Sequence, residues 1–138
     1  MFYLIGIFVF LADRICKIIA LSYIPDEGAV LIPKFFYFKF YKNFGAALSL
    51  KIPIEIIILL SFVVVFLILF FLKKEKIKKI PQYIPQILIF GAASNFFDRI
   101  YYGYVIDYFS FLNYSFFNIA DLMIIFSLGF VLYYYWKK

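Results

Sequence analysis

One uninterrupted apolar run limits the folds that are open to this chain. Residues 56–72, IIILLSFVVVFLILFFL, contain no charged side chain and a single hydroxyl, that of Ser61. An apolar stretch of this length is typical of a segment that crosses a lipid bilayer. The whole chain agrees, since 67% of its residues are hydrophobic and 16% are charged, whereas soluble domains are about half apolar and a quarter charged. The sequence therefore predicts an integral membrane protein.

Further apolar stretches on both sides of this run predict the rest of the fold. We expect an all-α membrane protein, a four-transmembrane-helix bundle that forms a single domain over residues 1–138. The spans are expected at about residues 2–23, 53–72, 84–99 and 116–136.

The connection between the first two predicted spans has a different pattern. In the stretch around residues 36–41, phenylalanines alternate with tyrosine and lysine, which is the periodicity of a strand. We therefore expect a small β-rich segment at about residues 30–50. Its aromatic side chains would lie at the depth of the lipid headgroups.

The placement of basic residues predicts the orientation. The link KKEKIKK, residues 73–79, holds five of the fourteen basic residues, and loops rich in lysine face the cytoplasm. With four spans, both termini would then be cytoplasmic and the β-rich segment would lie outside. Because the basic residues flank apolar spans, nucleic-acid binding is not expected.

Several polar residues converge on one level of the predicted bundle, just beneath its outer surface. They are Asp13, Asn43, Asn95, Asp98, Arg99, Asp107, Asn118 and Asp121. A charged side chain near the bilayer centre costs at least a few kcal/mol, so such residues usually face the bundle interior and mark a function.

Structural explanations for these polar residues stay open. Asp13 and Lys17 could form a plain salt bridge between positions i and i+4 of one helix. Asp98 and Arg99 could cap helices and pair with each other. Asn118 could be an N-terminal helix cap.

The chemistry available to these residues is that of carboxylates. Of two carboxylates in a site of low dielectric constant, one keeps a proton while the other stays charged, as in aspartic proteases. The chain has no histidine and one cysteine, which excludes serine–histidine chemistry, histidine metal sites and thiolate clusters. No metal and no cofactor is expected.

Five short blocks resemble, in order and spacing, the motifs of bacterial lipoprotein signal peptidase (signal peptidase II). They are DRICK at 13–17, KNFGAALS at 42–49, GAASNFFDR at 91–99, GYVIDYF at 103–109 and FNIAD at 117–121. The resemblance covers nearly the whole chain. Four positions depart from the usual family residues: Arg14 replaces Gln, Cys16 replaces Thr, Leu48 replaces Phe and Ser94 replaces Gly.

The resemblance implies an intramembrane aspartic endopeptidase that cleaves the signal peptide of prolipoproteins before the diacylglyceryl-modified cysteine. It assigns a catalytic pair, which would act on a water molecule, to Asp107 and Asp121. The implied substrate-binding residues are Asn43, Gly45, Asn95, Arg99 and Asn118, and the implied supporting residues are Asp13, Lys17 and Asp98. The protein would be a multi-pass monomer of the bacterial cytoplasmic (inner) membrane. It would contact membrane lipid and carry its site near the outer, periplasmic face.

Two other functions fit the same polar residues. A small multi-pass proton or cation transport or channel protein could use the buried carboxylates to relay charge. However, a conduction path needs polar groups through the full membrane thickness, and the cytoplasmic halves of the last three predicted spans offer almost none. A non-catalytic lipid-binding membrane protein is the third interpretation, and it would tolerate Asp107→Asn.

Overall fold

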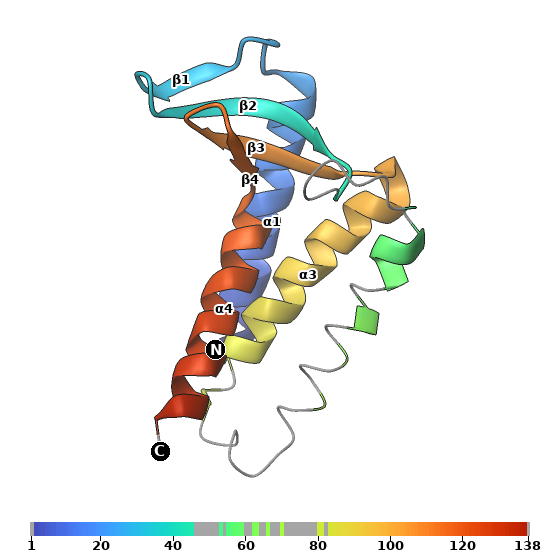
Figure 1. Ribbon diagram of the computed structural model, residues 1–138, viewed down its shortest axis with the longest axis vertical. Helices are drawn as coiled ribbons and strands as arrows, with labels where there is room; N and C mark the ends of the chain where they lie inside the picture. The colour runs from blue at the N-terminus through green and yellow to red at the C-terminus, as the bar shows by residue number, and fades with distance from the viewer. Residues whose placement is uncertain are drawn as a thin grey trace.

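A four-stranded sheet lies across one end of three helices, and both termini lie at the opposite end (Figure 1). The computed structural model describes residues 2–45, 53, 55–59, 62–63, 66, 70, 80–81 and 83–137. The helices include α1 (Phe2–Ser22), α3 (Tyr83–Tyr102) and α4 (Ile119–Trp136). The strands are β1 (Ala29–Ile32), β2 (Phe36–Asn43), β3 (Val105–Phe111) and β4 (Ser115–Phe117).

The predicted all-α class is wrong, because the four strands form one antiparallel sheet in the order β1-β2-β3-β4. The expected β-rich segment at about 30–50 supplies β1 and β2. Strand β3 lies between the spans expected at 84–99 and 116–136, and β4 overlaps the start of the last expected span. Positions 105–108 of β3 are all buried, so the strand lacks the alternation of polar and apolar residues by which a half-buried strand is detected.

The predicted transmembrane bundle is also corrected. The stretches expected at 2–23, 84–99 and 116–136 do form the helices α1, α3 and α4. Nevertheless, within the described residues no helix combines the length and the apolar character that crossing a membrane requires.

Charged residues inside two of the helices explain part of this outcome. Helix α1 carries Asp13, Arg14 and Lys17, and α3 carries Asp98 and Arg99. Each charge lowers the mean hydropathy of the segment around it. The predicted span at 53–72 falls largely outside the described residues, as does the whole lysine-rich link at 73–79.

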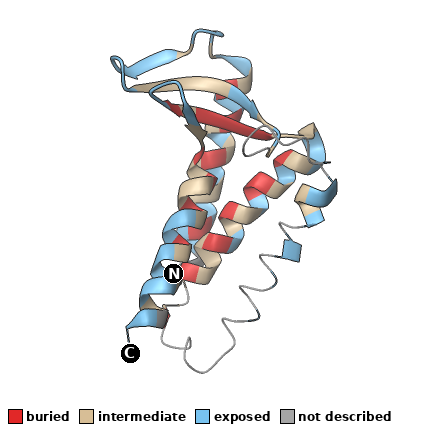
Figure 2. Ribbon diagram, viewed as in Figure 1, coloured by how far each residue is buried: buried red, intermediate tan, exposed pale blue. Residues whose placement is uncertain are grey.

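Helix α3 packs against both α1 and α4, and β3 lies over α1 and α3. Gly91 allows the close approach of α3 to α4, because a Cβ atom there would meet the Ala120 carbonyl oxygen at 2.8 Å and the Met123 Cβ at 2.9 Å. Figure 2 shows the buried residues on β3 and on the inner sides of the helices.

Much of this interior is polar. The buried residues where α1, α3, β3 and α4 meet include four charged side chains and two amides. Buried groups of this kind must be paired or hydrogen-bonded to be tolerated. The junction of the sheet with the helices is therefore the place to look for a functional site.

Candidate active site

The two aspartates that the family resemblance singled out come from different elements. Asp107 lies in the middle of β3 and is fully buried, whereas Asp121 is the third residue of α4 and is partly exposed. Asn118 is the N-cap of α4, as one prediction had it. Its Oδ1 accepts a hydrogen bond from the Asp121 backbone N–H at 2.8 Å, and Asp121 Oδ2 accepts one from the Asn118 backbone N–H at 3.2 Å. This reciprocal capping box fixes the Asp121 carboxylate at the helix start.

The same asparagine also reaches the other carboxylate. Asn118 Nδ2 donates to Asp107 Oδ1 at 2.7 Å and to the Ile106 carbonyl oxygen at 3.3 Å. One fully buried side chain thus contacts both aspartates. The cap of α4 and the middle of β3 are held in a single site.

Two further asparagines complete the shell around the carboxylates. Asn43 lies at the end of β2, two positions beyond Tyr41, the pairing partner of Asp107, and therefore on the same face of the sheet. Its Nδ2 donates to Asp107 Oδ2 at 2.9 Å, and Asn95 Nδ2 of α3 donates to Asp121 Oδ1 at 2.7 Å. Every oxygen of the two carboxylates consequently accepts a hydrogen bond from an amide N–H.

Gly45 holds the Asn43 side chain. The Gly45 backbone N–H donates to Asn43 Oδ1 at 2.8 Å. This turn places Gly45 at a φ of 75°, a left-handed conformation that favours glycine over residues with a Cβ atom.

Burial of Asp107 changes its protonation. Removal from water, followed by repulsion from the nearby Asp121 charge, raises the pKa of Asp107 from its ordinary value near 3.8 to about 6. The hydrogen bonds from Asn43 and Asn118 act in the opposite direction, because they stabilise the ionised form. The site therefore favours a proton on Asp107 well above the pH at which an exposed aspartate has lost it.

A second layer of charge lies beneath the two aspartates. Lys17 is fully buried, and its Nζ lies 2.9 Å from Asp13 Oδ2, 2.7 Å from Asp98 Oδ2 and 2.9 Å from Asn95 Oδ1. The expected salt bridge between Asp13 and Lys17 is confirmed. Lys17 also crosses from α1 to α3, which spacing along one helix does not predict.

The carboxylates of this layer fasten the neighbouring elements. Asp13 Oδ1 accepts hydrogen bonds from the Tyr108 hydroxyl at 2.8 Å and from the Ala120 backbone N–H at 3.2 Å. Asp98 Oδ2 accepts one from the Ile106 backbone N–H at 3.2 Å. The layer thereby fixes β3 on both sides of Asp107 and the first turn of α4.

The two arginines of the site differ in their partners. Asp98 pairs with Arg14 and Lys17 rather than with its neighbour Arg99. Arg99 is half-buried and forms no ion pair with any residue in the described part of the chain, and its Nη1 lies 3.4 Å from the Asn95 carbonyl oxygen.

Two of the departures from the family pattern contact each other. Arg14 lies over the ring of Phe97, 4.7 Å from its centroid, and its Nη1 is 3.5 Å from Ser94 Oγ. Ser94 in turn donates to Asp13 Oδ2 at 2.6 Å. Arg14 and Ser94 therefore extend the same charged layer.

Ser94 and Tyr108 belong to the site, although the sequence did not predict them as members of it. Tyr108 is fully buried, and its hydroxyl accepts from the Ile119 backbone N–H at 3.0 Å while it donates to Asp13. A strand assignment for 105–111 alone would not have found Tyr108, because the residue next to Asp107 on a strand faces the opposite side.

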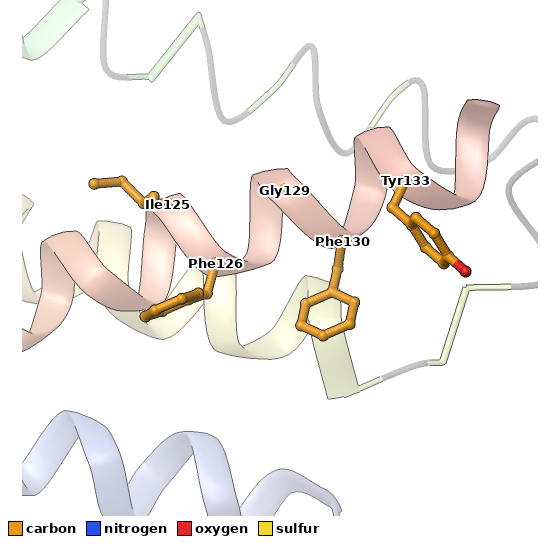
Figure 3. Close-up of a pocket in the computed structure, with 5 residues that line it drawn as sticks. All are labelled: Ile125, Phe126, Gly129, Phe130 and Tyr133. Atoms are coloured by element: carbon orange, nitrogen blue, oxygen red, sulfur yellow. The ribbon is translucent and has the colours of Figure 1, made fainter. Parts of the chain in front are cut away.

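A surface hollow on α4 contains none of this chemistry (Figure 3). It is lined by Ile125, Phe126, Gly129, Phe130 and Tyr133. These residues bring no carboxylate, amide or basic group. The catalytic candidates are therefore the polar residues at the junction of the sheet with the helices.

Comparisons with known proteins identify the family of this chain. The sequence profile of the family described as Signal peptidase (SPase) II matches residues 5–137. The lipoprotein signal peptidase of Halothermothrix orenii is 27% identical over 141 residues, which cover 100% of this chain and 97% of the relative. That of Histophilus somni (strain 129Pt) is 34% identical over 130 residues, which cover 87% and 79%.

A solved structure, described as that of a bacterial membrane enzyme, shares the fold. The TM-score is 0.83 at 24% identity, with 98% of this chain and 92% of the other covered. A second such structure gives a TM-score of 0.78 at 25% identity, with 94% and 84% covered. On the match of the family profile to nearly the whole sequence, the chain belongs to the signal peptidase II family and is a peptidase of that family's aspartic class.

Proposed function

We propose that this peptidase removes the signal peptide of prolipoproteins by cutting before the diacylglyceryl-modified cysteine, with Asp107 and Asp121 as its catalytic pair. The observation that carries the assignment is the double contact of Asn118, whose side chain bonds Asp107 and caps the helix turn that holds Asp121. The name lipoprotein signal peptidase, borne by the relatives, supports the choice of substrate. Membership of a peptidase family favours this function over transport of protons or cations.

In the proposed mechanism the two aspartates share one proton and hold one water molecule between them. The ionised carboxylate takes a proton from the water as the water oxygen attacks the scissile carbonyl carbon. The protonated carboxyl donates a hydrogen bond to the oxyanion that develops. The proton taken from the water then passes to the leaving amine. The raised pKa of Asp107 supports a shared proton, and the titration belongs to the pair rather than to either residue.

The asparagines are better suited to hold the pair than to bind substrate. Asn43, Asn95 and Asn118 each donate an amide N–H to a carboxylate of the pair. Arg99 has no ion-pair partner among the described residues. We therefore assign Arg99 to a carbonyl group of the substrate backbone and the three asparagines to positioning of the pair.

The exposed surface of the helices supports contact with membrane lipid. Large apolar side chains are exposed on α1 (Leu4, Phe8 and Leu11) and on α4 (Phe126 and Phe130). Apolar surface on this scale marks an interaction site. We propose a place in the bacterial cytoplasmic membrane, with the sheet and the site toward the outer face and both termini toward the cytoplasm.

The test is cleavage of a diacylglyceryl-modified prolipoprotein by membranes that contain Asp107→Asn or Asp121→Asn. Each change should lower the cleavage rate at least about a hundredfold, because each removes a general acid or base. Asp26→Asn is the matched control, since Asp26 is exposed in the loop after α1, and it should cleave normally. Near-normal cleavage by either site variant contradicts the assignment of the pair.

A further inference from the structure

The three asparagines around the catalytic pair share one arrangement. In each, a donor holds the amide oxygen while the amide NH₂ group points at a carboxylate. The donors are the Gly45 backbone N–H for Asn43, the Asp121 backbone N–H for Asn118 and Lys17 Nζ for Asn95. Because these groups can only donate, the oxygen must face them and the NH₂ group must face the carboxylate. Asn95 is the one member of the three that is oriented by a side chain.

Lys17 is itself held rigidly. Its ammonium group has three protons and no acceptor. Two of its neighbours are the Asp13 and Asp98 carboxylates, from α1 and α3, and the third is Asn95 Oδ1. Ser94 Oγ lies slightly farther away, at 3.3 Å. Since two ion pairs from two helices fix the nitrogen, the donor that faces Asn95 has a fixed direction.

We propose that Lys17 is a positioning residue for the peptidase reaction, which orients the Asn95 amide so that its NH₂ group donates to Asp121 Oδ1. Lys17 does not touch Asp121 through any hydrogen bond of the described structure, so it acts chiefly through Asn95. The proposal rests on the catalytic role assigned to Asp121. Without Lys17 the amide can rotate and present its oxygen to the carboxylate, which then turns out of the reactive geometry.

If Lys17 served only to hold α1 against α3 by pairing with Asp98, Arg14 would have the same role. Both residues belong to α1 and both pair with Asp98, but Arg14 contacts none of the three asparagine side chains. The usual family residue at position 14 is Gln. Arg14→Gln is therefore the matched control, because it removes a charge from the same layer and leaves the contact of Lys17 with Asn95 in place.

The pH–rate profile distinguishes a role of Lys17 in positioning Asn95 from a purely structural role. The charged groups that interact with Asp121 are Lys17 and Asp13 of α1, Arg99 of α3 and Asp107 of β3. Asp98 of α3 pairs with Lys17 and Arg14 instead. Loss of Lys17 removes a positive charge and frees the Asn95 amide to turn, and both effects disfavour the ionised pair. The acidic limb of the profile should therefore move to higher pH in Lys17→Met.

The experiment is a double-mutant cycle with Lys17→Met, Asn95→Leu and the double variant. The readouts are kcat, KM and the pH profile on a diacylglyceryl-modified prolipoprotein, per amount of folded enzyme. Lys17→Met should lower kcat roughly ten- to a hundredfold, as loss of positioning does, with little change in KM. In the Asn95→Leu background, Lys17→Met should change kcat by less than about twofold, because contacting residues are not additive. Arg14→Gln should leave the acidic limb in place.

Three results would overturn the proposal: unchanged kcat in Lys17→Met, the same loss of kcat with and without Asn95, or an equal shift of the acidic limb in Arg14→Gln. If Lys17→Met does not fold, two other variants are compared: the single variant Asp13→Asn and the double variant Asp13→Asn/Lys17→Met. The double variant removes one negative and one positive charge, so it leaves the net charge of the buried layer unchanged. Lower kcat in that double variant than in Asp13→Asn supports the proposal, and equal kcat contradicts it. Failure of the proposed function is distinguishable, because it appears as activity in Asp121→Asn whatever Lys17 does.

Discussion

At the scale of single residues, burial in the site disfavours ionisation of the Asp107 carboxyl group. Asp107 is fully buried, and its raised pKa means that ionisation weakens the folded state. The folded protein binds this proton more tightly than the unfolded chain does. The stabilising contribution is complete below about pH 3.8 and is lost as the pH rises through about 6.

The raised pKa of Asp107 predicts that the stability of the wild-type protein depends on pH differently from that of Asp107→Asn. Between about pH 4 and pH 7, the free energy of unfolding of the wild type should fall relative to that of the variant by up to about 3 kcal/mol. The measurement is unfolding of both proteins in detergent across this pH range. Parallel pH dependences of the two proteins would contradict the raised pKa of Asp107.

At the scale of elements, the start of α4 serves stability and chemistry at once. The capping box orders the first turn of the helix, and the same Asn118 side chain bonds β3 through Asp107 and Ile106. The start of the helix and the middle of the strand, which are not adjacent in the sequence, are therefore held together. The two functions of Asn118 can be separated because a serine can cap a helix but cannot reach Asp107.

We predict different outcomes for Asn118→Ser and Asn118→Ala. In Asn118→Ser, the contribution of the helix cap to the free energy of unfolding should change by only a few tenths of a kcal/mol. Asn118→Ala should be about 1 kcal/mol less stable than Asn118→Ser, because alanine cannot cap the helix. Both should lose most of the cleavage activity, since both remove the donor to Asp107. Thermal unfolding and prolipoprotein cleavage, measured side by side, test this, and an active Asn118→Ser would show that the bond to Asp107 is dispensable.

At the scale of the whole molecule, the family motifs singled out residues that the fold brings together, whereas the fold itself was predicted only in part. The family motifs named Asp107, Asp121 and the three asparagines, and these residues lie within one hydrogen-bonded network. The positions of α1, α3 and α4 followed from long apolar stretches. Strands β3 and β4 did not follow, because most of β3 is buried and β4 is only three residues long.

Other parts of the site depend on packing that no local pattern contains. Lys17 looked satisfied by Asp13 within its own helix, so nothing indicated its contacts with Asp98 and Asn95 of α3. The contact of Arg14 with Ser94 joins residues 80 positions apart. Such contacts exist only once α1 and α3 are packed side by side.

The most direct test of the central claim is an experimental structure with an uncleavable lipopeptide bound across the site. We expect the Asp107 and Asp121 carboxylates to flank the scissile carbonyl group, within reach of one shared water molecule. Carboxylates separated by more than about 8 Å, or a scissile bond that lies away from both, would contradict a two-aspartate mechanism.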